Sequence, residues 1–196
     1  MLTRSTAGVS IAQLRQRLDK DGISAILEGD TPESSTWKRL FLKHTDGTPI
    51  ADIERNDVKP GSFGFEELQE FSEGLDECKP DTAARWLRDF LESVKAVYAF
   101  QVLQGADKGR GSDAIWAIEA ELWGSLGGIF QSDGEGFSNE DGYHILWQFD
   151  SHVSGPWKMA VLGTDDHWIA FEMDLGNRDH RVAFMAGQVP RGVKRL

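Results

Sequence analysis

The stretch Trp157-Lys-Met-Ala-Val-Leu-Gly-Thr-Asp-Asp-His-Trp-Ile-Ala-Phe-Glu-Met173 contains two runs of alternating apolar and polar residues on either side of a short turn. A period of two is typical of β-strands, because successive side chains of a strand point to opposite faces of the sheet. The segment Tyr143–Asp150 alternates in the same way, and Arg181–Met185 repeats the pattern more weakly. Short turns separate these runs, so we predict a C-terminal antiparallel β-meander.

Two apolar segments in the middle of the chain have the period of helices. One runs from Pro80 to Gly105 and is apolar around most of its circumference, so we expect it to be the longest helix and the spine of the core. The other begins near Ser112, which can cap it, and ends at Gly127-Gly128. Both helices are expected to cover the apolar face of the meander.

The N-terminal region begins with a helix signal. The Ser10 side chain can cap the helix, and the Gln13 side chain can accept from the Ser10 amide to complete a capping box. Val9 can pack on Leu14. Gly22 is a suitable residue for the helix to stop at. We therefore expect the first helix to lie between Ser10 and Gly22.

A β-hairpin is expected after this helix. Its arms are Trp37–His44 and Pro49–Arg55, which flank Asp46-Gly47, a dipeptide preferred in type I′ turns. A short strand at Ile23–Leu27 and an acidic loop at Glu28–Ser35 precede it. Together these segments predict one α+β domain over residues 1–196, with an N-terminal helix and hairpin, a central helical block and the C-terminal meander.

The chain is strongly acidic, with 32 acidic against 21 basic residues and a formal net charge of −11. This charge disfavours binding to nucleic acid or to an anionic membrane, and it favours a basic partner. Seven acids lie between Glu66 and Asp81, where a second, shorter helix is expected, and Lys79 is the only base among them. The alternative is that this helix face is acidic only for solubility.

The compartment is indicated by two features of the sequence. No apolar run approaches the length of a membrane span, and the N-terminus lacks the apolar core of a secretory signal. The single Cys78 rules out an internal disulfide and suits a reducing environment. We therefore expect a cytoplasmic protein, and nothing in the sequence indicates a cofactor.

The glycine-rich segment Gln131–His144 is the most conspicuous candidate for a binding site. It concentrates oxygen-bearing side chains between apolar elements, and calcium and magnesium prefer such ligands. The candidate ligands of such a cation are Asp133, Glu135, Glu140 and Asp141, and Asn139 is a further candidate for ligand binding. Their spacing does not fit an EF-hand, and the alternative is a hairpin loop whose glycines and acids serve the turns.

A second candidate site lies on the mixed face of the meander. If the strand registers hold, the parities of His144, Lys158, Trp168 and Glu172 place them on one side of the sheet. A His beside a Glu can transfer protons, and a Trp can act as a stacking platform. The alternative is a solvated sheet face with cross-strand ion pairs.

The basic loop Gly105–Ser112 gives a weaker third candidate. Lys108, Arg110 and Ser112 precede a predicted helix, and the amides at the start of a helix attract anions. The glycine spacing does not match a P-loop, and the loop follows a predicted helix rather than a strand. An ordinary helix–helix connection is the alternative.

Two functions of different classes follow from these observations. The first is a non-catalytic binding protein whose acidic surface receives a basic macromolecular partner, since the chain has neither a Gly-x-Ser-x-Gly nor a His-Glu-x-x-His motif. The alternative is an enzyme that binds a small molecule or a divalent metal through the 131–144 loop and the adjacent sheet face. The composition favours the first.

Overall fold

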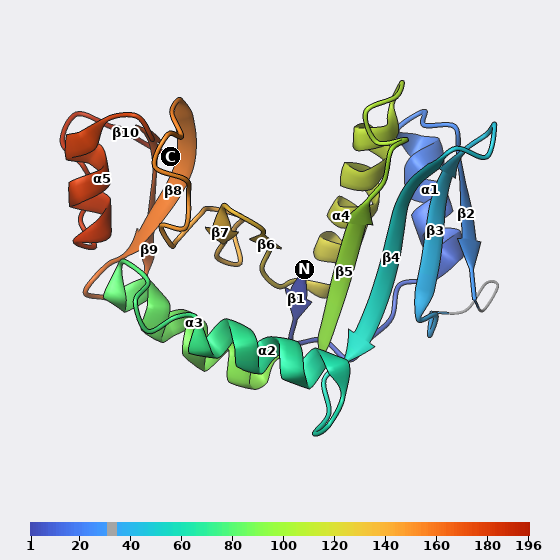
Figure 1. Cartoon of the computed structure of the whole chain (residues 1–196), viewed down its shortest axis with the longest axis horizontal. Coiled ribbons are helices and arrows are strands. Elements are labelled where there is room, and N and C mark those ends of the chain that lie inside the picture. Colours follow the sequence, from blue (N-terminus) through green and yellow to red (C-terminus); the bar gives the residue numbers. More distant parts are fainter. Residues whose placement is uncertain (31–34) are drawn as a thin grey trace. The chain divides into compact units, whose positions relative to one another are not determined.

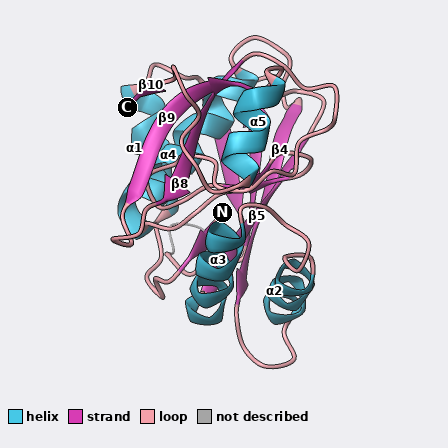
Figure 2. Cartoon of the chain, turned by 90° about the vertical axis from the view of Figure 1, so that its left-hand side faces the viewer, coloured by secondary structure: helices cyan, strands magenta, loops and turns pink. Residues whose placement is uncertain are grey.

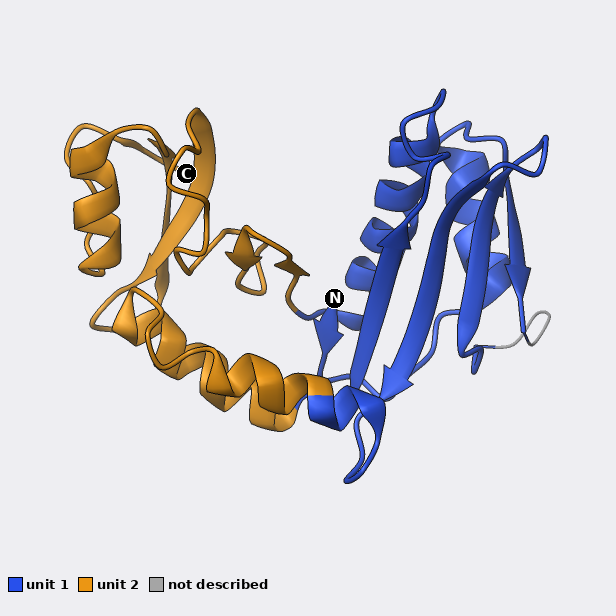
Figure 3. Ribbon diagram, viewed as in Figure 1, with its two compact units in different colours: residues 1–66, 94–128 blue, residues 67–93, 129–196 orange. Residues whose placement is uncertain are grey.

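The computed structural model describes residues 1–30 and 35–196, which form two compact units (Figure 3). Residues 1–66 and 94–128 make the first unit, and residues 67–93 and 129–196 make the second. The described residues contain five helices together with antiparallel sheets, so the predicted α+β class is confirmed. No helix among them is long and apolar enough to cross a membrane.

The first unit is built on one antiparallel sheet (Figure 1). Across the sheet its strands are β1 (Leu2–Thr3), β5 (Ala96–Val102), β4 (Pro49–Asp57), β3 (Arg39–His44) and β2 (Ala25–Gly29). The predicted hairpin is therefore present as β3 and β4, and Gly47 has the positive φ of 87° that its turn requires. The predicted short strand is also present, displaced by two residues toward β3. Residues 31–34 of the expected acidic loop lie outside the described residues.

Two helices of the first unit, α1 (Ile11–Lys20) and α4 (Gly111–Leu126), pack against each other and against the sheet. The capping box predicted for α1 is present, because the Gln13 amide donates to Ser10 Oγ and the Ser10 amide donates to Gln13 Oε1. Gly22 follows α1 with a φ of 64°. Both predicted ends of this helix are confirmed.

The predicted long helix from Pro80 to Gly105 is wrong in its second half. Helix α3 covers Asp81–Ser93, and the chain then forms β5, which is hydrogen-bonded between β1 and β4. The first three residues of β5, Ala96, Val97 and Tyr98, are buried consecutively, and such a run lacks the alternation that separates a strand from a helix. The longest helix of the described residues is instead α4, with 16 residues, and it belongs to the first unit.

The second unit contains a small antiparallel sheet of β10 (Lys194–Arg195), β9 (Trp168–Asp174) and β8 (Pro156–Leu162) (Figure 2). The predicted strands are present as β8 and β9, and Met159, Val161, Phe171 and Met173 are buried on one face, although Ala160 on the other face is buried as well. Phe184 of helix α5 (Arg178–Met185) joins this apolar cluster. Helix α3 also contacts β8, but its Trp86 meets Trp168 on the opposite face of the sheet. The prediction that the two central helices cover the apolar face is therefore wrong, since Phe184 of α5 packs on that face and α4 belongs to the first unit.

Two segments of the predicted meander are not strands. Residues 181–185 belong to α5, whose N-cap Asn177 accepts hydrogen bonds from the amides of Asp179 and His180. Residues 143–150 form only isolated bridges, and their amides bond to several separate segments. Ile145 donates to Phe137 O at 2.9 Å and Trp147 donates to Lys79 O at 2.8 Å. Consecutive burial of Ile145 and Leu146 also breaks the alternation that the sequence suggested.

The first turn of α4 gives a stability prediction. A Cβ added at Gly111 would lie 2.2 Å from the carbonyl oxygen of Gly105, so Gly111→Ala should lower the free energy of unfolding by about 1–3 kcal/mol. Gly124, in the same helix, has open space around it, and Gly124→Ala should raise that free energy by about 0.5–1 kcal/mol. Urea unfolding of both variants measures the contrast. Equal effects at the two positions would contradict the packing described here.

Candidate functional site

The 131–144 segment folds as a small hairpin of β6 (Gln131–Ser132) and β7 (Gly136–Phe137) followed by a turn. Gly136 has a φ of 107°, and a side chain there would meet Gln148 Oε1 at 3.0 Å. Phe137 is buried and makes an edge-to-face contact with Phe71 of α2 (Phe63–Glu73), with 5.4 Å between ring centroids. The hairpin is therefore held by an aromatic contact with α2.

Asn139, one of the candidate ligand-binding residues, is fully buried and organises the turn. Its Oδ1 accepts hydrogen bonds from the amides of Asp141 at 3.1 Å and Tyr143 at 2.9 Å. The neighbouring Ser138 Oγ accepts from the Phe130 amide and donates to the Asn139 carbonyl. The side chain oxygen of Asn139 is thus engaged by backbone amides, which is the role that the alternative interpretation assigned to this loop.

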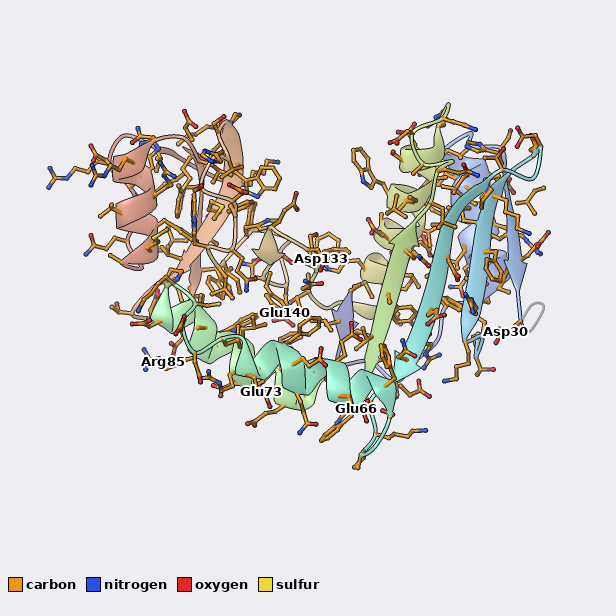
Figure 4. The ribbon with its side chains drawn as sticks, viewed as in Figure 1. Asp30, Glu66, Glu73, Arg85, Asp133 and Glu140 are labelled. Atoms are coloured by element: carbon orange, nitrogen blue, oxygen red, sulfur yellow. The ribbon has the colours of Figure 1, made fainter. Side chains whose placement is uncertain are left out.

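The carboxylates of the loop are not brought together. Asp133, Glu140 and Asp141 are exposed, whereas Glu135 is half-buried. Figure 4 shows Asp133 and Glu140 at separate places along the loop. Among residues 1–30 and 35–196, no three His, Cys, Asp or Glu side chains are grouped so that they could hold one metal ion.

Glu67 of α2 is a carboxylate near this loop that the sequence did not single out. Burial raises the pKa of Glu67, and the charges of Glu70 and Asp133 add to the rise. Its Oε2 is buried without a hydrogen-bond partner among the described residues. The helical spacing of α2 indicated an apolar stripe and an acidic face, and Glu67 lies between them, so no sequence signal distinguished it.

The second predicted constellation is divided between the two faces of the C-terminal sheet. Lys158 and Glu172 are direct cross-strand partners, and Trp168 has the same parity, so these three residues share a face as predicted. His144 does not join them. Its ring contacts Trp157 and Phe149, with centroid distances of 5.3 and 5.5 Å, on the apolar side of the sheet.

His144 lies on the other side because its backbone forms a parallel bridge with Met159. The His144 amide donates to Lys158 O at 3.1 Å, and the Ala160 amide donates to His144 O at 2.8 Å. The prediction had placed His144 in a strand antiparallel to its neighbours, and only a tertiary bridge reverses the face on which its side chain falls. A His–Glu pair for proton transfer is not formed on this sheet.

The remaining mixed face is a packing surface at one end and a row of charges at the other. Trp168 makes an edge-to-face contact with Trp86 of α3 at 5.1 Å, so one edge of this ring meets the helix. Glu172 lies between Lys158 on β8 and Lys194 on β10 in the strand registers. Opposite charges at cross-strand positions stabilise a sheet modestly. This arrangement fits the structural interpretation of the face.

Two of the three side chains proposed to bind an anion, those of Arg110 and Ser112, form hydrogen bonds within the first unit. Arg110 donates to Asp113 and to the carbonyls of Asp21 and Gly22 just after α1, both at 3.0 Å. Ser112 donates to the Ala106 carbonyl at 2.9 Å and does not cap α4, which already begins at Gly111. Lys108 is exposed. The loop therefore ties the start of α4 to the end of α1.

Comparison with known proteins identifies no relative. The chain matches no protein-family model, and comparisons with curated proteins and with solved structures gave no significant match.

The environment of His144 predicts a dependence of stability on pH. Burial lowers the pKa of His144 to about 4, below the ordinary value of 6.5, because the aromatic surroundings disfavour the imidazolium. The unfolded chain therefore binds a proton that the folded chain does not, between the two pKa values. The contribution of neutral His144 to the free energy of unfolding is therefore complete above pH 6.5. It should fall by up to about 3 kcal/mol as the pH decreases toward 4.

The variant His144→Phe should remove this contribution, since it keeps an aromatic ring and cannot be protonated. Urea unfolding between pH 7 and pH 4 measures the slope for both proteins. His167→Gln provides the control, because His167 is exposed on a turn. A slope that survives in His144→Phe would show that other groups cause it.

The turn around Asn139 predicts a contrast within the loop. Asn139→Ala leaves two backbone amides without their acceptor and should lower the free energy of unfolding by about 1–3 kcal/mol. Asp141→Ala, at an exposed neighbouring position, should change it by less than about 0.5 kcal/mol. Thermal or urea unfolding measures both. Comparable losses in the two variants would contradict the role given to Asn139.

Proposed function

We propose that this chain is a non-catalytic binding protein whose acidic surface receives a basic macromolecular partner. The observation that carries the proposal is a line of exposed carboxylates on α2. Glu66, Glu70 and Glu73 are spaced so that they lie on one face of this helix, and Glu77 follows shortly after it. Figure 4 shows Glu66 and Glu73 along the same side of α2.

The carboxylates of this line differ from neighbouring acidic residues because they form no ion pairs among the described residues. The line consists of Glu66, Glu70, Glu73 and Glu77. Within the described parts of the chain, none of the four forms an ion pair with a basic side chain. By contrast, Asp76 pairs with Arg88 at 2.8 Å and Asp81 pairs with Lys79 at 2.6 Å.

Unneutralised like charges repel one another, and a basic partner would relieve that repulsion on binding. Such a potential also accelerates association with an oppositely charged partner. The excess of acids over bases in the whole chain acts in the same direction. Because the line extends along about two turns of α2 and continues to Glu77 beyond it, the matching partner is a row or patch of Lys and Arg on a macromolecule rather than a single cation.

Two further observations support a binding role over an enzymatic one. The candidate proton-transfer residues are divided between opposite faces of the C-terminal sheet, as described above. In the 131–144 loop, Asn139 Oδ1 accepts hydrogen bonds from amides of the same loop. The carboxylates of the loop are not grouped with other such side chains, among the described residues, so that they could hold a metal ion. We place the protein in the cytoplasm, because its one cysteine, Cys78, is a free thiol and suits a reducing compartment.

The test compares two variants with the same change in net charge. Glu70→Lys/Glu73→Lys reverses two charges in the α2 line, and Asp107→Lys/Glu121→Lys reverses two elsewhere. Binding of a fluorescent decalysine peptide, measured by anisotropy at low salt, should weaken at least about tenfold in the first variant and much less in the second. The affinity of the decalysine peptide for the unmodified protein should fall steeply as the salt concentration rises from about 0.1 M to 1 M.

Equal losses in both variants would mean that only the net charge matters, and this result would overturn the α2 line as the binding surface. Binding that is insensitive to salt would overturn the electrostatic proposal altogether. Melting curves of both variants establish that each is folded under the conditions of the assay.

A further inference from the structure

Residues 178–196 are basic, although the chain as a whole is acidic. They contain five Arg or Lys side chains and one carboxylate, Asp179, whereas residues 1–177 contain 16 bases and 31 acids. This basic segment forms α5 and β10 of the second unit. A concentration of positive charge in an acidic protein indicates a surface for an acidic partner.

Arg195 of β10 lies on the same side of the C-terminal sheet as helix α5 (Figure 1). It is the cross-strand partner of Phe171, and side chains of such partners share a face of the sheet. The Phe171 ring contacts Phe184 of α5, with 6.5 Å between the centroids. Lys194 is paired with Glu172 and therefore belongs to the opposite face.

Two further arginines lie on α5 itself. Arg178 and Arg181 are one turn apart, next to Val182, of which 61% is exposed. The Arg181 guanidinium lies 5.9 Å from the centre of the Trp147 ring and donates to the Ser151 carbonyl at 3.3 Å. These contacts fix the position of Arg181 and leave its charge without a carboxylate.

Arg191 adds a fourth charge on this side. It is exposed, and the segment that carries it packs through Val189 and Val193 on the apolar cluster that includes Phe184. Within residues 1–30 and 35–196, none of these four arginines forms an ion pair. We define the α5 surface as Arg178, Arg181, Arg191 and Arg195.

We propose that the basic partner of the α2 line is the α5 surface of a second copy of this chain, an inference that rests on the proposed function and names its partner. Four carboxylates without bases on one surface correspond to four guanidinium groups without acids on the other. Arginine suits this role because its planar group can bond both oxygens of a carboxylate.

The spacing of the charges agrees with this pairing. Glu70 and Glu73 of α2 are three residues apart in a helix, and so are Arg178 and Arg181 of α5. Each pair therefore spans about 4.5 Å along its helix axis. An α2 helix laid along α5 brings two carboxylates opposite two guanidinium groups.

The charges also favour a second copy over other acidic partners. Nucleic acid and anionic membranes are extended polyanions, which the net charge of −11 on this chain repels. A second copy presents its acids to the α5 surface as a short row, and repulsion between its other charges is screened beyond about 10 Å in 0.1 M salt. The contact joins different surfaces of the two copies, so it repeats until a ring closes or an open chain forms.

Sedimentation velocity of the full chain in 0.1 M salt provides the test. Exposed ion pairs contribute little individually, so species larger than a monomer should form as the concentration approaches about 0.1 mM. They should dissociate in 1 M salt or when decalysine occupies the α2 line. Arg178→Glu/Arg195→Glu, which reverses two exposed charges, should raise the dissociation constant at least about tenfold without weakening decalysine binding.

A mixing experiment tests the complementarity directly. In Arg178→Glu/Arg195→Glu the α5 surface loses its positive charge, and in Glu70→Lys/Glu73→Lys the α2 line loses its negative charge. Each variant alone should therefore remain monomeric, whereas an equimolar mixture should associate, because each variant supplies the surface that the other lacks. Net charge does not explain this result, since both variants remain negative: each double reversal changes the formal charge of −11 by four units.

The matched control is Lys20→Glu/Lys108→Glu, which makes the same charge change as the arginine variant at two exposed positions of the first unit. It should associate as the unmodified chain does. Melting curves establish that every variant is folded. Equal weakening in the control and in the arginine variant overturns the inference, as does a mixture of the two complementary variants that stays monomeric.

The outcomes separate this inference from the proposed function. An unmodified chain that remains monomeric while decalysine binds the α2 line overturns only the pairing with a second copy. The same holds when a monomeric chain binds a decaglutamate peptide through the α5 surface, because the acidic partner is then another molecule. Failure of decalysine to bind the α2 line overturns the proposed function and this inference together.

Discussion

The pairing of β5 with β4 is the constraint on which the architecture depends. Seven residue pairs, from Ala51–Val102 to Asp57–Ala96, join these strands in one antiparallel register. Between the end of β4 and the start of β5 the chain builds α2 and α3, and most of that excursion belongs to the second unit. The first unit is therefore discontinuous in sequence, and its sheet is complete only when the chain has returned. Such a non-local pairing costs loop-closure entropy before its contacts form.

Aromatic burial has a comparable role in the second unit. The rings of Trp147, Phe149 and Trp157 surround one face of the C-terminal sheet, with Phe184 of α5 on the same side. His144 is drawn into this environment by backbone bonds to β8, and its depressed pKa is a consequence of packing. A titratable group in such a position contributes to the pH dependence of folding. Its perturbation is therefore weak evidence for catalysis in this chain.

The interaction surface that we propose on α2 follows from charges that the fold does not neutralise. Its carboxylates are exposed without basic partners among the described residues, and the missing interaction is electrostatic, long-ranged and sensitive to salt. This surface therefore selects a partner by charge.

Several features could be predicted from the amino-acid sequence because their signals are local and unambiguous. The capping box at Ser10 and Gln13, the Asp46-Gly47 turn and the alternation of β8 and β9 each involve residues close in the chain, and all three are present. The face shared by Lys158, Glu172 and Trp168 follows from that alternation. The acidity of α2 was also evident, because charge requires no tertiary information.

Contacts between distant segments determine which apolar segments form strands and which side of the sheet His144 occupies. Residues 96–102 carry no period that separates a central strand from a helix, and they become β5 because β1 and β4 pair with them. Residues 181–185 alternate, yet the Asn177 cap and the burial of Phe184 make them part of α5. In both segments, burial and hydrogen bonding in the folded protein outweighed a weak local preference.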